Sequence, residues 1–133
     1  MAEMTVKLRS MPDTAACVGW AGAHAVVVDR PAGKAGGQGL GFNGGELLGL
    51  AIGGCLCNDL HYVAAAMGIQ LLVVSVDVTV TLGGEPLLAT AATVQVAVEP
   101  AAPGADVETL IREAVAISTV SNSIARDIPV RLG

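Results

Sequence analysis

The chain has 133 residues, of which 53% are hydrophobic and only three are aromatic, and its formal net charge is −5. This length suits a single domain, residues 1–133, whose core is built from small branched side chains. The seven basic residues are scattered along the sequence. They form no basic stripe, so binding to nucleic acid is excluded as a main function.

Hydropathy and cysteine content narrow the class of protein further. The mean hydropathy is high for a monomer of this size, which indicates a subunit interface, with a homodimer as the default. The uncharged run Leu47–Cys57 supplies about half of the ~20 residues that span a bilayer, so we expect no contact with a membrane. The N-terminus does not look like a signal peptide, and three cysteines form no paired framework. We therefore expect a cytoplasmic protein with free thiols.

Two strands are predicted near the N-terminus. Thr5–Ser10 and His24–Arg30 carry apolar residues between polar ones and are predicted to pair antiparallel, with Trp20 and Gly22 near the turn that joins them. Residues 31–41, with the sequence PAGKAGGQGLG, follow as a glycine-rich connection. We expect this connection to lack regular structure and to be mobile.

A long helix is predicted from Asn43 to Gly68. Asn43 can accept a hydrogen bond from the first turn and Glu46 can reach back to it, so the pair is typical of a capping box. Leu47–Cys57 carries no charge, which places this helix at the centre of the fold. Glycines at positions 49, 53 and 54 predict the close approach of another helix.

The remaining elements complete an α+β order. Strict alternation in Leu71–Leu82 and a return in Leu88–Glu99 predict a β-hairpin whose apolar side covers the central helix. Asp106 is predicted to cap the helix Val107–Ile117. A short helical turn at 120–126 and a last strand at 128–132 give the order β-β-α-β-β-α-(α)-β, with segregated sheets and helices.

Cys55 is the first candidate for chemistry. A buried helical cysteine, taken alone, is more often a small hydrophobic residue than a nucleophile. A reactive thiol needs a nearby cation or hydrogen-bond donors. Asp59, one turn further along, instead adds a negative charge, which disfavours a second anion beside it.

Metal and cofactor sites have weaker support. Cys57 lies about 200° around the helix from Cys55, so the two thiols diverge and do not form a redox pair. Cys57 and His61 share a helix face and could supply two metal ligands, while His24 and Cys17 lie too far away in sequence to be placed. The glycines at 36, 37, 39 and 41 do not form a phosphate-binding loop. We expect no bound cofactor.

Three segments of the sequence resemble motifs of one known protein family. A glycine-rich segment leads into Asn43-x-x-Glu46-Leu-Leu, a run of small residues ends in Cys55-Leu56, and S-x-x-S-x-x-I-x-x-x-I-P-V spans residues 118–130. With the order of elements, they resemble the OsmC/Ohr family, that of osmotically inducible protein C and organic hydroperoxide resistance protein, over essentially the whole chain. The resemblance implies an intertwined homodimer whose long central helices pack together between the sheets, with thiol sites at the interface.

The resemblance also implies roles for particular positions. In peroxidase members of the family, a helix cysteine attacks a hydroperoxide, a second cysteine closes a disulfide, and an arginine with a glutamate holds the first as thiolate. Cys55 matches the first role, but Ser118 stands at the second position. The turn at residues 19–24 contains no arginine, and the glutamate position falls at Gly45, one place before Glu46.

The leading hypothesis is therefore thiol-dependent reduction of organic hydroperoxides. Cys55 is the predicted nucleophile, Glu46 the second catalytic residue, and an external thiol the reductant. An arginine from either subunit, Arg9, Arg30 or Arg126, would replace the missing one. The alternative is a catalytically degenerate dimer that binds a small apolar ligand or a protein partner in the interface cleft, and a third option is a metal-binding module.

Overall fold

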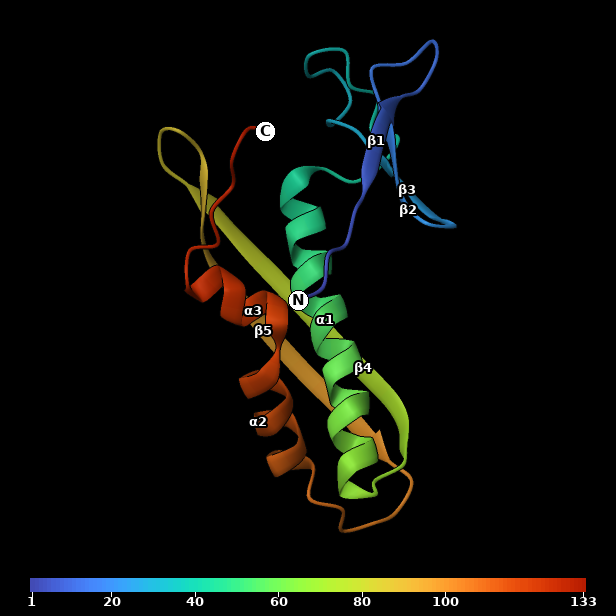
Figure 1. Ribbon diagram of the computed structural model, residues 1–133, viewed down its shortest axis with the longest axis vertical. Helices are drawn as coiled ribbons and strands as arrows, with labels where there is room; N and C mark the ends of the chain where they lie inside the picture. Colours follow the sequence, from blue (N-terminus) through green and yellow to red (C-terminus); the bar gives the residue numbers. More distant parts are fainter. The chain divides into compact units, whose positions relative to one another are not determined.

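The computed structural model describes all residues, 1–133, as an α+β protein with two antiparallel sheets and three helices (Figure 1). The chain divides into two compact units, residues 1–47 and 48–133. The sequence-based expectation of one domain remains a prediction.

The first unit contains a three-stranded sheet rather than the predicted pair of strands. Its strands are β1 (Lys7–Ser10), β2 (Cys17–Ala21) and β3 (His24–Val28), in the order β1-β2-β3. The prediction that β1 pairs directly with β3 is wrong, because β2 lies between them and Trp20 pairs with Ala25 inside the sheet. The tight turn after β2 needs only two residues, and its Gly22 has a positive φ of 58°.

Residues 31–41 have no regular structure, as predicted, but they are held by hydrogen bonds. The carboxylate of Asp29, 4% exposed, accepts hydrogen bonds from the backbone amides of Leu40 at 3.0 Å, Gln38 at 3.1 Å and Arg30 at 2.8 Å. These bonds, led by that of Leu40, and the charge of Arg30 hold the pKa of Asp29 below its ordinary value, against the opposing effect of burial. The predicted mobility stays a prediction, and the hydrogen bonds to this buried carboxylate oppose it.

The central helix begins and ends where the sequence predicts. Helix α1 spans Gly44–Met67, and the capping box is present: the Asn43 amide donates to Glu46 Oε1 at 3.0 Å, and the Glu46 amide donates to Asn43 Oδ1 at 2.9 Å. Gly68 ends the helix with a φ of 69°. By length and composition alone, α1 could cross a membrane, although the core helix of a water-exposed fold meets the same criteria.

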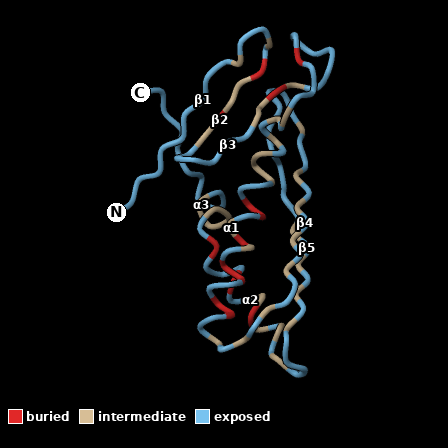
Figure 2. The backbone as a smooth tube through the Cα atoms, turned by 90° about the vertical axis from the view of Figure 1, so that its right-hand side faces the viewer, coloured by how far each residue is buried: buried red, intermediate tan, exposed pale blue.

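The second unit is built on a long hairpin that confirms the alternation in the sequence. Strands β4 (Leu71–Gly83) and β5 (Leu88–Pro100) pair antiparallel, with Val76 opposite Val96 and Val78 opposite Val94. Helices α1 and α2 (Val107–Ile117) both lie against one face of this hairpin, as the two views in Figures 1 and 2 agree.

The glycines of α1 contact this hairpin and not another helix. A Cβ at Gly49 would lie 3.5 Å from a methyl of Val80, and one at Gly53 would lie 3.0 Å from a methyl of Val78. Gly54 has open space around it. The predicted role of Gly49 and Gly53 is therefore corrected: they let α1 approach β4.

The C-terminal elements follow the prediction except for the last one. Asp106 caps α2 by accepting a hydrogen bond from the Thr109 amide at 3.1 Å, and α3 (Thr119–Ala125) follows directly. The predicted strand Ile128–Leu132 is absent: these residues form no ladder and are exposed. Without a neighbouring strand, their alternating apolar side chains have no sheet to join within the chain.

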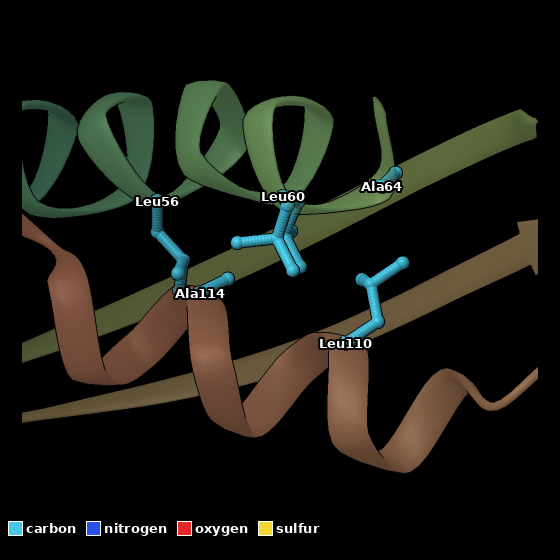
Figure 3. Packing of buried hydrophobic residues seen from close by; sticks show 6 residues of the cluster. Leu56, Leu60, Ala64, Leu110 and Ala114 are labelled. Atoms are coloured by element: carbon cyan, nitrogen blue, oxygen red, sulfur yellow. The ribbon is translucent and has the colours of Figure 1, made fainter. Parts of the chain in front are cut away.

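The core of the second unit lies between α1, α2 and the hairpin. Figure 3 shows Leu56 beside Ala114, and Leu110 near Leu60 and Ala64, so that α1 and α2 run antiparallel. Valines on the inner face of β4 and β5 pack against this cluster. These contacts set the position of α2 along the axis of α1.

Candidate functional site

Cys55 lies near the middle of α1, next to the core residue Leu56 in sequence, and is half-buried. Its Sγ donates a hydrogen bond to Oδ2 of Asp59 at 3.6 Å. The two residues are four apart, so their side chains lie on the same side of the helix, one turn apart. Asp59 is 8% exposed. The structure thus joins the predicted nucleophile to a buried carboxylate.

The charges around Asp59 are unusual for a buried carboxylate. The ion pairs of the chain join Arg30 to Asp29 and Arg112 to Glu108, so neither neutralises Asp59. No arginine or histidine side chain is hydrogen-bonded to the sulfur of Cys55, whose one partner is Asp59. A buried charge normally has an ionic partner or several hydrogen bonds.

Ser118 is the second feature of this region. It is 1% exposed, and its Oγ has no hydrogen-bond partner. Leu110 and Ala114 are buried on one side of α2, and Ser118, which is also buried, caps its C-terminus. Ser118 follows directly after α2 and has an extended backbone conformation.

Glu46 has a structural role within its own chain. Its carboxylate accepts the hydrogen bond that completes the capping box. Glu46 and Cys55 lie about two and a half turns apart along α1, or roughly 14 Å along the helix axis. The structure therefore does not bring these two predicted site residues together on one protomer.

The three arginines considered as replacements all contact groups close to them. Arg30 pairs with Asp29 and donates to the carbonyl oxygen of Ala15. Arg126 donates to Asn122 on α3 at 3.1 and 3.2 Å. Arg9 donates to the carbonyl of the preceding residue at 2.8 Å. Each guanidinium already has a hydrogen-bond acceptor.

The remaining metal-ligand candidates do not gather into a site. No group of three or more histidine, cysteine, aspartate or glutamate side chains is arranged to hold a metal ion. Cys57 is half-buried and His61 is exposed on α1, while Cys17 lies in β2 of the first unit. All three cysteines are free.

Sequence reasoning missed a cavity in the first unit. It measures about 330 Å³ and is lined by apolar atoms of β1, β2, β3 and Leu47. Leu8, Trp20, Val26 and His24 are among its lining residues. The apolar residues Val6 and Leu8, and Val26 and Val28, alternate in the sequence and could have revealed one apolar side of a sheet.

The central helix α1 is capped and carries a half-buried thiol, and the hairpin and α2 pack against it. The protein is therefore of the α+β class, with a thiol on its central helix. The chain belongs to the family of OsmC-like proteins, whose family model matches residues 36–133. This result confirms the resemblance seen in the sequence. A comparison with curated protein sequences gives no significant match.

Solved structures agree on the fold. An OsmC-like protein of unknown function from Vibrio cholerae matches with a TM-score of 0.80 and 12% identity, over 92% of this chain and 94% of that one. The organic hydroperoxide resistance protein OhrB of Bacillus subtilis matches with a TM-score of 0.63 and 18% identity, over 98% and 96%. An organic hydroperoxide resistance protein from Legionella pneumophila gives 0.62 and 20%, over 93% and 90%.

Proposed function

We propose that this protein reduces organic hydroperoxides with a thiol reductant and that Cys55 is the nucleophile. The observation that carries the proposal is the position of Cys55: a free, half-buried thiol at mid-length of the central helix, within the part of the chain that matches the OsmC-like family. Several similar structures are named as organic hydroperoxide resistance proteins. Three free cysteines suit a reducing compartment, and we propose the cytoplasm.

The chemistry requires an external reductant. Attack of the Cys55 sulfur on the hydroperoxide oxygen releases an alcohol and leaves a sulfenic acid, and one thiol molecule then forms a mixed disulfide that a second thiol reduces. Ser118 has no sulfur to close an internal disulfide. We therefore propose a small dithiol or a protein dithiol as the physiological reductant.

The proposed reaction takes place in a homodimer. The exposed side of α1 carries Leu50 and Tyr62, and open space surrounds Gly54, so this side suits contact with a second copy. A dimer would also allow Glu46 of one chain to approach Cys55 of the other, which is the only route to the catalytic role predicted for it. We propose that residues 1–133 form one OsmC-like domain in each protomer, because similarity to the solved structures covers 92% of the chain or more.

The proposal is tested by following the consumption of an organic hydroperoxide in the presence of a dithiol. Wild type should consume peroxide faster than Cys55→Ser, whereas Cys57→Ser, which removes a neighbouring thiol from the same helix, should keep most of the activity. Equal rates for wild type and Cys55→Ser would refute the enzymatic function.

The apolar cavity supports a second candidate function, the binding of a small apolar molecule. Its lining is apolar and includes Trp20, the only tryptophan of the chain. Titration with 1-alkanols of increasing length should change the emission of Trp20, and Leu8→Gln should weaken the effect by placing a polar group in the lining. Emission that does not respond to any alkanol would exclude this site.

A further inference from the structure

The buried carboxylate of Asp59 lies beside the proposed nucleophile. It lies on α1, one turn after Cys55, with 8% of its surface exposed, and it accepts the hydrogen bond of the Cys55 thiol at 3.6 Å. Asp59 therefore contacts the sulfur atom that attacks the hydroperoxide in the proposed reaction. Within residues 48–133, no cationic side chain forms an ion pair with it.

We propose that Asp59 is the acid-base partner of Cys55, which takes the thiol proton during attack on the hydroperoxide and gives it to the departing alkoxide. This inference rests on the proposed function. It assigns a catalytic residue within the chain to a site whose arginine and second cysteine are replaced by other residues.

The geometry suits the transfer of one proton between Cys55 and Asp59. The thiol of Cys55 donates to the carboxylate of Asp59, so the thiol proton already lies between the two groups. Two anions within 4 Å of each other, without a cation, are strongly disfavoured. Transfer of one proton from the Cys55 sulfur to the Asp59 carboxylate therefore forms the thiolate without placing two anions side by side.

The reaction step balances with this single proton. The proton passes from Cys55 to Asp59 as the sulfur attacks the terminal oxygen of ROOH and the O–O bond breaks. The electron pair of that bond leaves on RO⁻, which takes the proton from Asp59 and departs as ROH. Sulfur is oxidised by two electrons to Cys–SOH, the peroxide is reduced, and Asp59 returns to its ionised form.

Hydroperoxides with different leaving groups test this role. An alkyl hydroperoxide releases an alkoxide, which needs a proton, whereas peroxyacetic acid releases acetate, which does not. In a Cys17→Ser, Cys57→Ser background, Asp59→Asn should slow the oxidation of Cys55 by tert-butyl hydroperoxide by about 100-fold, the lower range of general acid-base catalysis. Oxidation by peroxyacetic acid should slow less, by about tenfold, because the departing acetate needs no proton although the thiol proton must still be removed.

Two further variants control the result. Asp77→Asn removes one carboxylate charge from the exposed face of β4 and should alter neither rate. Asp59→Glu keeps a carboxylate and should recover part of the selective loss. If Asp59→Asn changes both oxidation rates by the same factor, or accelerates both, the carboxylate acts through charge or packing and the inference is overturned.

Failure of the proposed function gives a different signature. If wild type oxidises no faster than free cysteine with either peroxide, the peroxidase proposal fails whatever the variants do. The hydrogen bond between Cys55 and Asp59 is then measured independently by the infrared S–H stretch of Cys55. This band is assigned by its loss in Cys55→Ser. A shift to higher wavenumber in Asp59→Asn supports the shared proton, and an unchanged band overturns it.

Discussion

Asn43 and Glu46 satisfy each other's backbone amides at the start of α1, with reciprocal hydrogen bonds of 3.0 and 2.9 Å. The helix that carries Cys55 therefore begins at a fixed residue. A well-defined start matters because it sets the rotation at which every later side chain of α1 faces the hairpin and α2.

Asn43→Ala is expected to lower the free energy of unfolding by about 1 kcal/mol, because the first turn loses its cap. Glu46→Gln should leave stability unchanged, since glutamine also completes a capping box. Urea unfolding followed by far-UV circular dichroism measures both. If Glu46 acts only as a cap, Glu46→Gln should reduce peroxide at the wild-type rate. A lower rate at unchanged stability would establish the catalytic role predicted for Glu46.

Two glycines on the inner side of α1 should respond in opposite directions to alanine. A new Cβ at Gly49 makes an ordinary contact at 3.5 Å with Val80, so Gly49→Ala should raise the free energy of unfolding by up to ~1 kcal/mol through helix propensity. At Gly53 the Cβ would lie 3.0 Å from Val78, and crowding should lower stability by about 1 kcal/mol. Equal effects in chemical denaturation would contradict the packing of α1 on β4.

The buried hydroxyl of Ser118 is expected to reduce the stability of the fold. Its Oγ has no partner and makes no cap for α3, so Ser118→Ala should raise the free energy of unfolding by about 1 kcal/mol, as an unpaired buried polar group is removed. Ser123→Ala is the matched control, because Ser123 Oγ donates to the Thr119 carbonyl at 2.7 Å. A loss of stability in Ser118→Ala would show that the hydroxyl has a hydrogen-bond partner in solution.

The connection at residues 31–41 should loosen in acid. The pKa of Asp29 is held below 3.8 by the hydrogen bond from Leu40 first of all. A carboxyl with a lowered pKa stabilises the folded form above its unfolded pKa of 3.8 and loses this effect as the pH falls through its folded value. Amide exchange at Gln38 and Leu40, compared with amides of β2 and corrected for intrinsic rates, should accelerate below about pH 4. Asp29→Asn should remove this pH dependence; the same dependence in the variant would assign it to another group.

Local signals in the sequence predicted most elements of the fold. The caps at Asn43 and Asp106, the stop at Gly68 and the alternation of β4 all act within a few residues, so the boundaries of α1, α2 and the hairpin followed from them. The strand β2 was missed because CVGWA contains a glycine and a tryptophan beside a turn signal. Its pairing with β1 depends on residues about ten positions away.

The candidate site was predicted less completely. The position of Cys55 on a helix followed from the sequence, and so did the proximity of Asp59, one turn away. The burial of Asp59 and the unpaired hydroxyl of Ser118 depend on tertiary packing, which no local pattern specifies. The Asp29 cluster escaped prediction for a similar reason, since its partners lie across a glycine-rich segment.

The central claim is that the thiol of Cys55 reduces organic hydroperoxides. The most direct measurement is the second-order rate at which stoichiometric tert-butyl hydroperoxide oxidises the single remaining cysteine of the Cys17→Ser, Cys57→Ser protein, read by mass spectrometry as trapped sulfenic acid. We predict a rate at least tenfold above that of free cysteine at the same pH, and trapped product at Cys55. A rate equal to that of free cysteine would contradict the proposed function and leave the family and the fold as the established results.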